Sequence, residues 1–306
     1  MPKPYLPKEF KEKYERLLGD ESSAFFESCM TKPAKSLIIN RLKTDDYGFL
    51  KELETSFEKV RYLDNTFFIK SEVSGFGNLI EQNIGLFQMQ EVSSILPAIV
   101  LDPKPSDIVL DLTAAPGNKT AVLAQLMGNR GLIIANDIDK SRLNTLIFTL
   151  KKQGVTNTVV TCQNGINFNP GFLFNRILLD APCSCEGMVR KKPDLLRDWS
   201  EALVKSKAIV QKRLLSNAVS LLKDDGVLVY STCTLSPEED EEVIDYAVTE
   251  LHCRTEEIRL PGVPSSNGLL EYNHKRYCPD VSRAMRLWPH KSGTEGFFIC
   301  KLKKEA

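Results

Sequence analysis

Residues 108–120, with the sequence Ile-Val-Leu-Asp-Leu-Thr-Ala-Ala-Pro-Gly-Asn-Lys-Thr, decide the fold that this chain predicts. The apolar run 108–114 predicts a buried strand, and the helical spacing that follows predicts a helix over 118–127. A loop of small residues joins the two. A strand that passes through a short loop into a helix is the repeating unit of a parallel sheet covered by crossover helices.

The same alternation continues toward the C-terminus. The expected strands are 108–114, 131–138, 158–163, 174–181 and 227–233, and the expected helices are 118–127, 140–153, 193–222 and 237–250. Two further expected strands, 254–260 and 296–303, have no helix between them, so we expect them to form an antiparallel edge. The fold class is therefore α/β, with a doubly wound and mostly parallel sheet and an antiparallel C-terminal edge.

The first 75 residues lack this alternation and predict a small α+β module. We divide the chain into residues 1–75 and 76–306. Within the module we expect a helical segment at 6–30, strands at 36–43 and 62–70, a helix at 44–57 and a turn-rich joint at 71–77.

The composition excludes several classes of protein. The chain has 306 residues and a net charge of zero, from 40 Lys+Arg and 40 Asp+Glu, which excludes a strongly basic nucleic-acid binder at the level of the whole chain. Residues 183–223 nevertheless carry nine basic and four acidic side chains, so a local positive patch is permitted. No apolar run approaches the length of a membrane span, and residues 1–20 lack the apolar core of a signal peptide. The eight cysteines are spread thinly, and we expect a cytoplasmic monomer without membrane contact.

The loop after the first strand is compared with three classes of cofactor site. A dinucleotide site needs the spacing G-x-G-x-x-G, but this loop offers Gly117 alone. A phosphate-binding P-loop needs glycine directly before Lys-Ser/Thr, whereas Asn118 precedes Lys119. An S-adenosylmethionine loop needs only an acid ending the strand, Asp111, and one tight glycine. Asp137 ends the second strand, where an acid can hold both ribose hydroxyls. An ordinary turn with a solvated aspartate stays open as the alternative.

Two more loops carry reactive side chains at the end of a strand. They are DAPCSC at 180–185, after the fourth strand, and STCT at 231–234, after the fifth. Because the carboxyl ends of parallel strands meet at one edge, Asp180, Cys183 and Cys233 can converge on a pocket beside a methyl donor.

A thiol at such a pocket suits the methylation of a pyrimidine. Carbon 5 becomes nucleophilic enough to accept a methyl group once a thiolate has added to carbon 6. A base must then remove the carbon 5 proton so that the thiolate can leave. An acid such as Asp180 favours the addition by contacting the ring nitrogen or the exocyclic amine of cytosine.

Other interpretations of these cysteines stay open. A single cysteine is often a small buried hydrophobe. A zinc site favours C-x-x-C pairs, whereas Cys183 and Cys185 are spaced C-x-C with no histidine nearby in sequence, so we expect no metal. A disulfide between Cys183 and Cys233 fits the expected geometry but not a reducing compartment. An amino-group methyltransferase is expected to carry Asn/Asp-Pro-Pro-aromatic rather than DAPC.

An ordered set of motifs resembles the Fmu/Sun family of RNA cytosine-carbon-5 methyltransferases. The motifs are Asn40-Arg41 with Lys43, GLFQMQE at 85–91 with Ser93-Ser94, AAPGNKT at 114–120, DAPCS at 180–184, STCT at 231–234, RLWPH at 286–290 and GFF at 296–298. The resemblance spans most of the chain. It implies a Rossmann-like methyltransferase core that uses S-adenosylmethionine, preceded by an RNA-recognition-like module.

The resemblance also implies roles for individual residues. Cys233 is similar to the nucleophile of the family, and Cys183 to the second cysteine that is needed to release the product. Asp180 matches an acid shared between the donor and the target base, and Lys119 matches a lysine near the active site. The implied donor-binding residues are Thr113, Ala114, Ala115, Pro116, Gly117, Asn118, Lys119, Asp137, Arg142, Asn164 and Asp180.

Two positions depart from the family pattern. Asn164 stands before Gly165 where the family usually has an aspartate that holds the adenine amino group, although an amide oxygen can still accept that hydrogen bond. Thr113 stands where many relatives have cysteine or alanine, and we expect little consequence from this change.

The opening residues 6–10 and the stretch 185–194 look most like archaeal tRNA methyltransferases, so tRNA is the expected substrate and ribosomal RNA the alternative. A non-catalytic RNA-binding assembly factor is a further alternative, which Asn164 favours and the two retained cysteines oppose. Candidates for contacts with phosphates beside an everted cytosine are Arg190, Lys191, Lys192, Arg286 and His290, with a solvated loop as the alternative.

Overall fold

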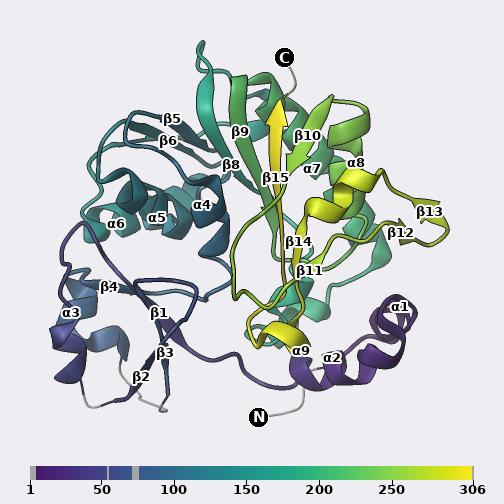
Figure 1. The fold of residues 1–306 in the computed structure, drawn as a ribbon, viewed down its shortest axis with the longest axis horizontal. Coiled ribbons are helices and arrows are strands. Elements are labelled where there is room, and N and C mark those ends of the chain that lie inside the picture. The colour runs from purple at the N-terminus through teal and green to yellow at the C-terminus, as the bar shows by residue number, and fades with distance from the viewer. Residues whose placement is uncertain (1–4, 54, 71–75, 305–306) are drawn as a thin grey trace.

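The computed structural model describes residues 5–53, 55–70 and 76–304, and a nine-stranded sheet lies at the centre of that part of the chain (Figure 1). Five of its strands are parallel neighbours in the order β9-β8-β5-β6-β7. They are β5 (Ile108–Asp111), β6 (Leu132–Asn136), β7 (Thr158–Thr161), β8 (Phe174–Asp180) and β9 (Leu222–Thr232). The predicted doubly wound, mostly parallel sheet is confirmed.

The predicted antiparallel edge is also present. Strand β15 (Phe297–Lys304) pairs antiparallel with β9 and with β10 (Cys253–Glu256). Two further strands, β14 (Met285–Leu287) and β11 (Ser266–Asn267), extend this edge. The sequence pattern did not reveal them because runs of three and two residues are too short to display a period of two.

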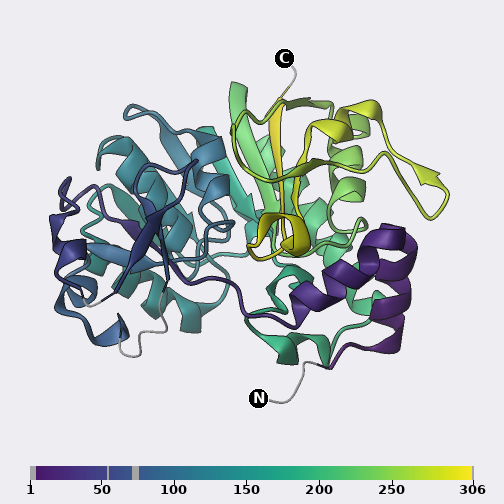
Figure 2. The ribbon, with the colours of Figure 1, turned by 60° about the horizontal axis from the view of Figure 1, so that its bottom comes forward.

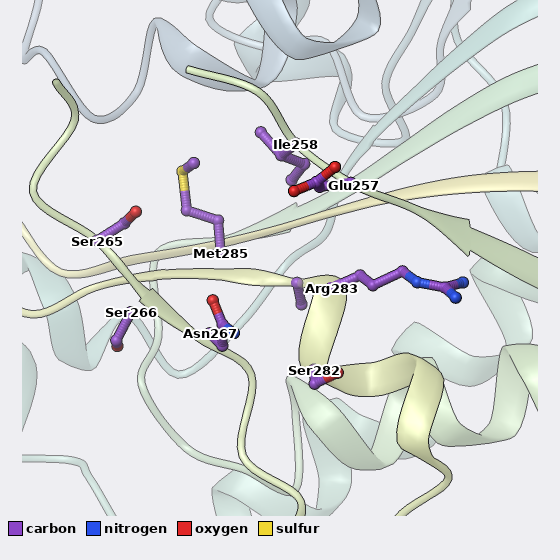
Figure 3. Close-up of a pocket in the computed structure, with 9 residues that line it drawn as sticks. Glu257, Ile258, Ser265, Ser266, Asn267, Ser282, Arg283 and Met285 are labelled. Atoms are coloured by element: carbon purple, nitrogen blue, oxygen red, sulfur yellow. The ribbon is translucent and has the colours of Figure 1, made fainter. Parts of the chain in front are cut away.

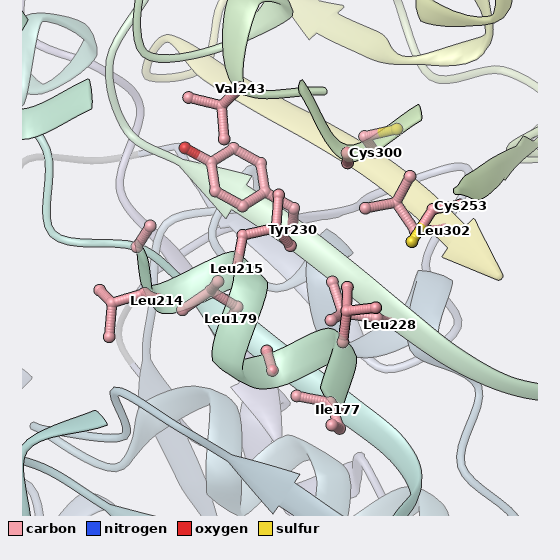
Figure 4. Close-up of a cluster of buried hydrophobic side chains, with 14 of the residues drawn as sticks. Ile177, Leu179, Leu214, Leu215, Leu228, Tyr230, Val243, Cys253, Cys300 and Leu302 are labelled. Carbon is pink, nitrogen blue, oxygen red and sulfur yellow. The ribbon is translucent and has the colours of Figure 1, made fainter. Parts of the chain in front are cut away.

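Helices cover both faces of the sheet (Figure 1). On one face lie α4 (Leu96–Leu101), α5 (Asn118–Met127) and α6 (Lys140–Gln153), and on the other lie α7 (Glu201–Ser220) and α8 (Glu241–Thr249). Neighbouring residues of one strand point to opposite faces, as Ile177 and Leu178 do by joining different apolar clusters. Figure 4 shows the cluster beneath α7, where Leu214 and Leu215 of that helix face the sheet around Tyr230. No helix of the described residues is apolar over a length that would cross a bilayer.

Two of the expected helices begin later than the sequence predicts. Helix α7 begins at Glu201 rather than near Pro193, because the Ser200 side chain caps it by accepting from Leu203 N–H at 3.1 Å. The preceding segment, Pro193–Leu196, forms a separate 3-10 helix. Helix α8 begins at Glu241 rather than at Pro237. Helices α5 and α6 span the predicted residues.

A second, four-stranded antiparallel sheet lies near the N-terminus, in the order β2-β3-β1-β4. Its strands are β1 (Ser36–Ile39), β2 (Phe57–Lys59), β3 (Thr66–Ile69) and β4 (Phe87–Met89). Since β4 pairs with β1, the sheet continues past residue 75. Where the chain divides into domains stays a prediction. Most of the expected joint, 71–75, lies outside the described residues.

The prediction of a helix over 44–57 was wrong. Thr44 Oγ1 accepts from Asp46 N–H at 3.0 Å, and Asp46 Oδ1 accepts from Gly48 N–H at 2.7 Å. These side chains compete with helical hydrogen bonds and produce turns, followed by the short 3-10 helix Gly48–Lys51. Phe57, the expected end of the helix, instead begins β2.

The helical segment expected at 6–30 forms two helices, α1 (Lys8–Leu18) and α2 (Ser22–Cys29), separated by Gly19 at φ +53°. They do not cover the four-stranded sheet: Figure 2 shows these two purple helices on the other side of the molecule. Their buried side chains Phe10, Tyr14 and Phe25 pack on residues of the C-terminal part of the chain, which are Val189, Leu196, Trp199, Val204, Leu235 and Trp288. The N-terminal helices therefore pack on loops and helices of the part of the chain that forms the larger sheet, not on the four-stranded sheet.

Candidate active site

The carboxyl ends of four neighbouring strands gather the residues that the sequence singled out. Asp111 ends β5, Asp137 follows β6, Asp180 ends β8 and Cys233 follows β9. Cys183 joins them from the loop after β8. Because these strands lie side by side in the order β9-β8-β5-β6, their loops meet at one edge of the sheet.

Small residues hold the loop between β5 and α5 against α6. Gly117 has φ +99°, and a Cβ at this position would lie 2.8 Å from Leu146 Cδ1. The other end of the loop is fixed by Ala114 N–H, which donates to Asn136 O at 2.7 Å. Any side chain at Gly117 would be strained and would push the loop away from α6. The loop leads into the N-terminus of α5, where backbone N–H groups favour electron-rich ligands.

Asp137 fastens this loop. Its carboxylate accepts from Ala115 N–H and from Asp139 N–H, each at 3.0 Å. Arg142 lies 3.7 Å from the same carboxylate and donates to Ala115 O. Asp137 is nearly buried, whereas the Arg142 side chain is 52% exposed. Each carboxylate oxygen keeps a lone pair for a ligand hydroxyl.

Asp111 lies beneath the loop. It is fully buried, and Thr120 Oγ1 donates to its carboxylate at 2.7 Å. Burial, only partly opposed by that hydrogen bond, raises the pKa of Asp111 to about 7. This residue therefore ties β5 to α5 and holds a proton over much of the neutral range.

Asn164 follows β7 with its side chain exposed, and its Oδ1 accepts from Ile166 N–H at 3.0 Å. A carbonyl oxygen has a second lone pair, so it can also accept from an adenine amino group. The edge thus offers a carboxylate for hydroxyl groups, an amide oxygen for an amino group and a loop of small residues between them. This set of groups fits an adenosine-containing methyl donor.

Asp180 is held by three elements. Lys119 Nζ donates to its Oδ2 at 2.7 Å, and Ser231 Oγ donates to its Oδ1 at 2.8 Å. Its backbone oxygen accepts from Thr113 Oγ1 at 2.8 Å. Burial acts to lower the pKa of Lys119, but the Asp180 carboxylate outweighs it and raises that pKa. A charged lysine therefore lies beside Asp180 between the donor loop and the thiols.

Three thiols meet next to this ion pair. Cys183 Sγ lies 3.3 Å from Cys233 Sγ and 3.9 Å from Cys185 Sγ. None of the three forms a disulfide. The sequence analysis brought Cys183 and Cys233 together, whereas Cys185 was treated only as a poorly spaced zinc ligand. The signal was present in the C-x-C spacing, which keeps both thiols in one short loop.

The three thiols shift one another's pKa. The hydrogen bond from Cys183, helped by Cys233 and by Lys207 and Lys192, lowers the pKa of Cys185 to about 3. Hydrogen bonds with Cys185 and Cys233 raise the pKa of Cys183. For Cys233, the bond with Cys183 acts to lower the pKa, but the bond with Cys185 and burial outweigh it and hold the pKa above its usual range. Cys185 is therefore the thiol that ionises most readily before substrate binds.

Glu186 joins the two cysteine loops. Its two oxygens accept hydrogen bonds from the side chains of Tyr14, Trp199, Thr234 and Ser236 and from the backbone N–H of Leu235. Gly187 N–H donates to Cys233 O at 2.9 Å, which adds a direct backbone bond between the loops. A Cβ at Gly187 would lie 2.1 Å from Gly296 O, so glycine is required there. Helix α1 takes part in this arrangement through Tyr14.

The prediction of phosphate contacts was wrong for three of the five candidate side chains, because they are buried against other parts of the chain. Arg190 is buried and donates to Thr31 O, Gly293 O and Thr294 O. Arg286 is fully buried against Asp240 and Glu241. His290 has a 6% exposed side chain and lies 3.2 Å from Glu21. A buried cation takes carboxylate or carbonyl partners from the chain itself. The remaining candidates, Lys191 and Lys192, are exposed.

Two cavities in the described residues lie elsewhere. One of about 330 Å³ opens at the antiparallel edge, where Arg283, Asn267, Ser265 and Glu257 surround it with polar groups (Figure 3). A second is lined by residues 166–173 and by the end of α7. Neither contains a thiol or a residue of the donor loop.

Comparison with known proteins decides which family carries this arrangement. The profile described as "16S rRNA methyltransferase RsmB/F" matches residues 98–303, and that described as "N-terminal domain of 16S rRNA methyltransferase RsmF" matches residues 6–92. The tRNA (cytosine(49)-C(5))-methyltransferase of Pyrococcus abyssi is 41% identical over 306 residues, which cover 97% of this chain and 96% of that protein. The chain belongs to the RsmB/F family.

Other RsmB/F relatives are similar over the whole chain. The ribosomal RNA small subunit methyltransferase F of Vibrio parahaemolyticus is 35% identical, and the match covers 99% of this chain but 64% of that longer protein. A methyltransferase homolog protein from Pyrococcus horikoshii has a solved structure with a TM-score of 0.88, 32% identity and coverage of 98% and 95%. The structure of NSun6 from P. horikoshii with SFG has a TM-score of 0.86, and at 24% identity it supports the fold alone.

Membership of the RsmB/F family confirms several of the sequence-based expectations. The resemblance to Fmu/Sun proteins and the Rossmann-like methyltransferase fold are confirmed. The chain is an S-adenosylmethionine-dependent RNA methyltransferase of the class that modifies carbon 5 of cytosine. Its residue roles and its RNA class are proposals.

Proposed function

We propose that this chain methylates carbon 5 of cytosine in tRNA through a covalent bond between Cys233 and carbon 6 of the base. The observation that supports it best is the 3.3 Å separation between the sulfurs of Cys183 and Cys233, from two loops at the same edge of the sheet. One thiol can attack the ring while the other lies within reach of the same base.

The first step forms the bond to the base. Cys233 first releases its proton to solvent. As the thiolate it then attacks carbon 6, and the electrons of the carbon 5–carbon 6 double bond move toward the ring nitrogen and the carbonyl oxygen. Asp180 accepts from the exocyclic amine of cytosine, and the charge of Lys119, 2.7 Å from Asp180, stabilises the electron density that develops. S-adenosylmethionine, when bound, supplies an electrophilic methyl group to which carbon 5 bonds.

The last step regenerates the enzyme. Cys183 first releases its own proton to solvent and then, as a thiolate, accepts the proton from carbon 5. The carbon 5–carbon 6 double bond reforms and the bond between Cys233 and carbon 6 breaks. Cys183 then carries the proton and Cys233 is again a thiolate, so atoms and charges balance. The donor is held by the loop 113–119 with Asp137, Arg142 and Asn164.

Two observations bear on the RNA class. The match to a tRNA methyltransferase covers 97% of this chain and 96% of that protein at 41% identity, which supports tRNA. The match of residues 6–92 to the N-terminal domain of a ribosomal RNA methyltransferase favours ribosomal RNA as the second candidate. In either case the exposed Lys191 and Lys192, next to the Cys183 loop, are placed to contact phosphates beside an everted base.

A non-catalytic assembly factor is the less favoured function. Such a protein has no need for a thiol pair or for a charged lysine beside Asp180. The unpaired state of the three thiols also supports our proposal of a reducing, cytoplasmic location.

The test is transfer of a labelled methyl group. The purified chain is incubated with labelled S-adenosylmethionine and with unmodified tRNA or ribosomal RNA, and each RNA is digested to nucleosides. We expect label in 5-methylcytidine from tRNA, and none when Cys233→Ala replaces the wild type. Label from ribosomal RNA alone would transfer the proposal to the second candidate. No label from either, in a chain that binds the donor, would support the assembly factor.

A further inference from the structure

The thiols of Cys183, Cys185 and Cys233 form a cluster tighter than methyl transfer requires. The proposed reaction uses two thiols, but the three sulfurs lie within 4.8 Å of one another. Two come from the loop after β8 and one from the loop after β9. Cys183 is buried, while the other two are partly exposed, so the cluster is open on one side.

The backbone conformation at Cys185 does not favour a cysteine. It has φ +61°, in the left-handed region that favours glycine. A non-glycine residue in this conformation is strained, and its side chain must contribute something in return. What the Cys185 side chain contributes is a third sulfur, 3.9 Å from Cys183 Sγ.

We propose that Cys183, Cys185 and Cys233 together bind one thiophilic divalent cation of the Zn²⁺ class, as three thiolate ligands with a fourth position open to water. Zn²⁺ bonds to sulfur at about 2.3 Å in a tetrahedron, which places the sulfurs about 3.8 Å apart. The observed separations of 3.3 Å and 3.9 Å need only small rotations of the side chains to match.

The charges around the cluster fit such an ion. Three thiolates and one divalent cation carry a net charge of −1. Lys192 and Lys207 act on Cys185, and Lys119 acts on Cys233, so positive charge surrounds the cluster. Cys185 ionises most readily, and Cys183 and Cys233 each release a proton to solvent as their bonds to the metal form.

The bound cation would exclude the target base. Cys233 cannot add to carbon 6 while its sulfur is bonded to a metal, so metal and cytosine compete for one site. This consequence rests on the proposed function, whereas metal binding rests on the thiol geometry alone. The cluster would therefore make this methyltransferase sensitive to free zinc.

The test measures metal affinity directly. The fully reduced full-length chain is first checked for its thiol content and then titrated with Co²⁺, whose thiolate charge-transfer and tetrahedral bands report binding, and with Zn²⁺ against a chromophoric chelator. The informative variant is Cys185→Gly, which suits the left-handed backbone and removes one ligand. The matched control is Cys162→Ser, at an exposed cysteine outside the cluster.

We expect one metal ion per wild-type chain, with tetrahedral thiolate bands. Cys185→Gly should weaken binding by more than the roughly 10–100-fold that loss of an outer-shell partner costs, while Cys162→Ser should leave it unchanged. Equal affinity in the wild type and Cys185→Gly, or an equal loss in Cys162→Ser, would overturn the proposal. Metal binding without inhibition of methyl transfer would leave the site intact and contradict the nucleophilic role of Cys233 instead.

Discussion

Replacing Glu186 by glutamine tests whether one buried carboxylate holds the two cysteine loops and helix α1 together. Glutamine has nearly the same shape but keeps one acceptor oxygen and replaces the other by an amino group. Trp199 Nε1 donates to one oxygen of Glu186 at 2.6 Å and Leu235 N–H to the other at 3.3 Å. Both can only donate, so either orientation of the amide leaves one buried N–H facing another donor.

Two effects bear on the cost. An unsatisfied buried N–H costs about 1–3 kcal/mol. The lost charge also affects Lys13, whose side chain is 0% exposed and whose remaining carboxylate partner, Glu238, lies 2.9 Å away. Breaking a buried ion pair costs about 3–5 kcal/mol. Because the Lys13–Glu238 pair remains, that larger cost does not apply, and the unsatisfied N–H sets the expected fall in the free energy of unfolding at about 1–3 kcal/mol.

Urea unfolding of the wild type and of Glu186→Gln measures this difference. The control is Glu12→Gln on the exposed side of α1, where the side chain is 45% exposed and lies 3.4 Å from Lys8. We expect the control to change stability by no more than about 0.5 kcal/mol. If Glu186→Gln costs less than about 1 kcal/mol, Glu186 does not hold the loops together and the reasoning fails.

The remaining predictions concern the donor site, the buried acid and the nucleophile. Asp137→Ala should weaken donor binding by about 1–3 kcal/mol through a lost hydrogen bond to a hydroxyl, and unchanged affinity by calorimetry would remove Asp137 from the site. Burial raises the pKa of Asp111 to about 7. The native state therefore keeps a proton that the unfolded chain loses near pH 4, and this stability is full at low pH and lost as pH rises through 7. Asp111→Asn should remove a slope of about 1.4 kcal/mol per pH unit between pH 5 and 6; an identical pH profile in urea unfolding would contradict the shifted pKa. Cys233→Ala should abolish methyl transfer with donor binding intact, and retained activity would refute its role.

The core of the fold was predictable because its signals are local and repeated. The strands β5 to β9 are apolar runs between helical segments, and parallel strands place their carboxyl ends at one edge whatever the loops contain. This rule alone was enough to predict that Asp180, Cys183 and Cys233 lie close together. Helices α5 and α6 followed from their helical spacing, and in the structure each ends at a glycine in the left-handed region.

The errors arose where long-range partners or side-chain hydrogen bonds decide the outcome. Arg190 and Arg286 were expected to contact phosphates because a basic residue in a loop looks the same in sequence whether exposed or buried. The structure buries Arg286 against Glu241, 45 residues earlier in the chain. Likewise, no periodicity reveals that α1 packs on the loops after β8 and β9 and on the start of α7 rather than on the strands that follow it.

The third thiol shows the same limit on a smaller scale. Cys185 follows Cys183 by two residues, but its position beside Cys233 depends on the left-handed backbone at Cys185. Sequence spacing argued against zinc because it considers ligands of one segment. The structure adds Cys185 to the pair formed by Cys183 and Cys233, and this addition changes what the cluster can bind.

Trapping the covalent intermediate tests the central claim most directly. The variant Cys183→Ala lacks the group that we expect to remove the carbon 5 proton, so the bond between Cys233 and the base should persist. With unmodified tRNA and S-adenosylmethionine, this variant should give a slow-migrating protein–RNA band on a denaturing gel, and Cys183→Ala/Cys233→Ala should give none. Peptide mapping should place the cross-link on Cys233. A Cys183→Ala chain that methylates tRNA at the wild-type rate and forms no adduct would contradict the account.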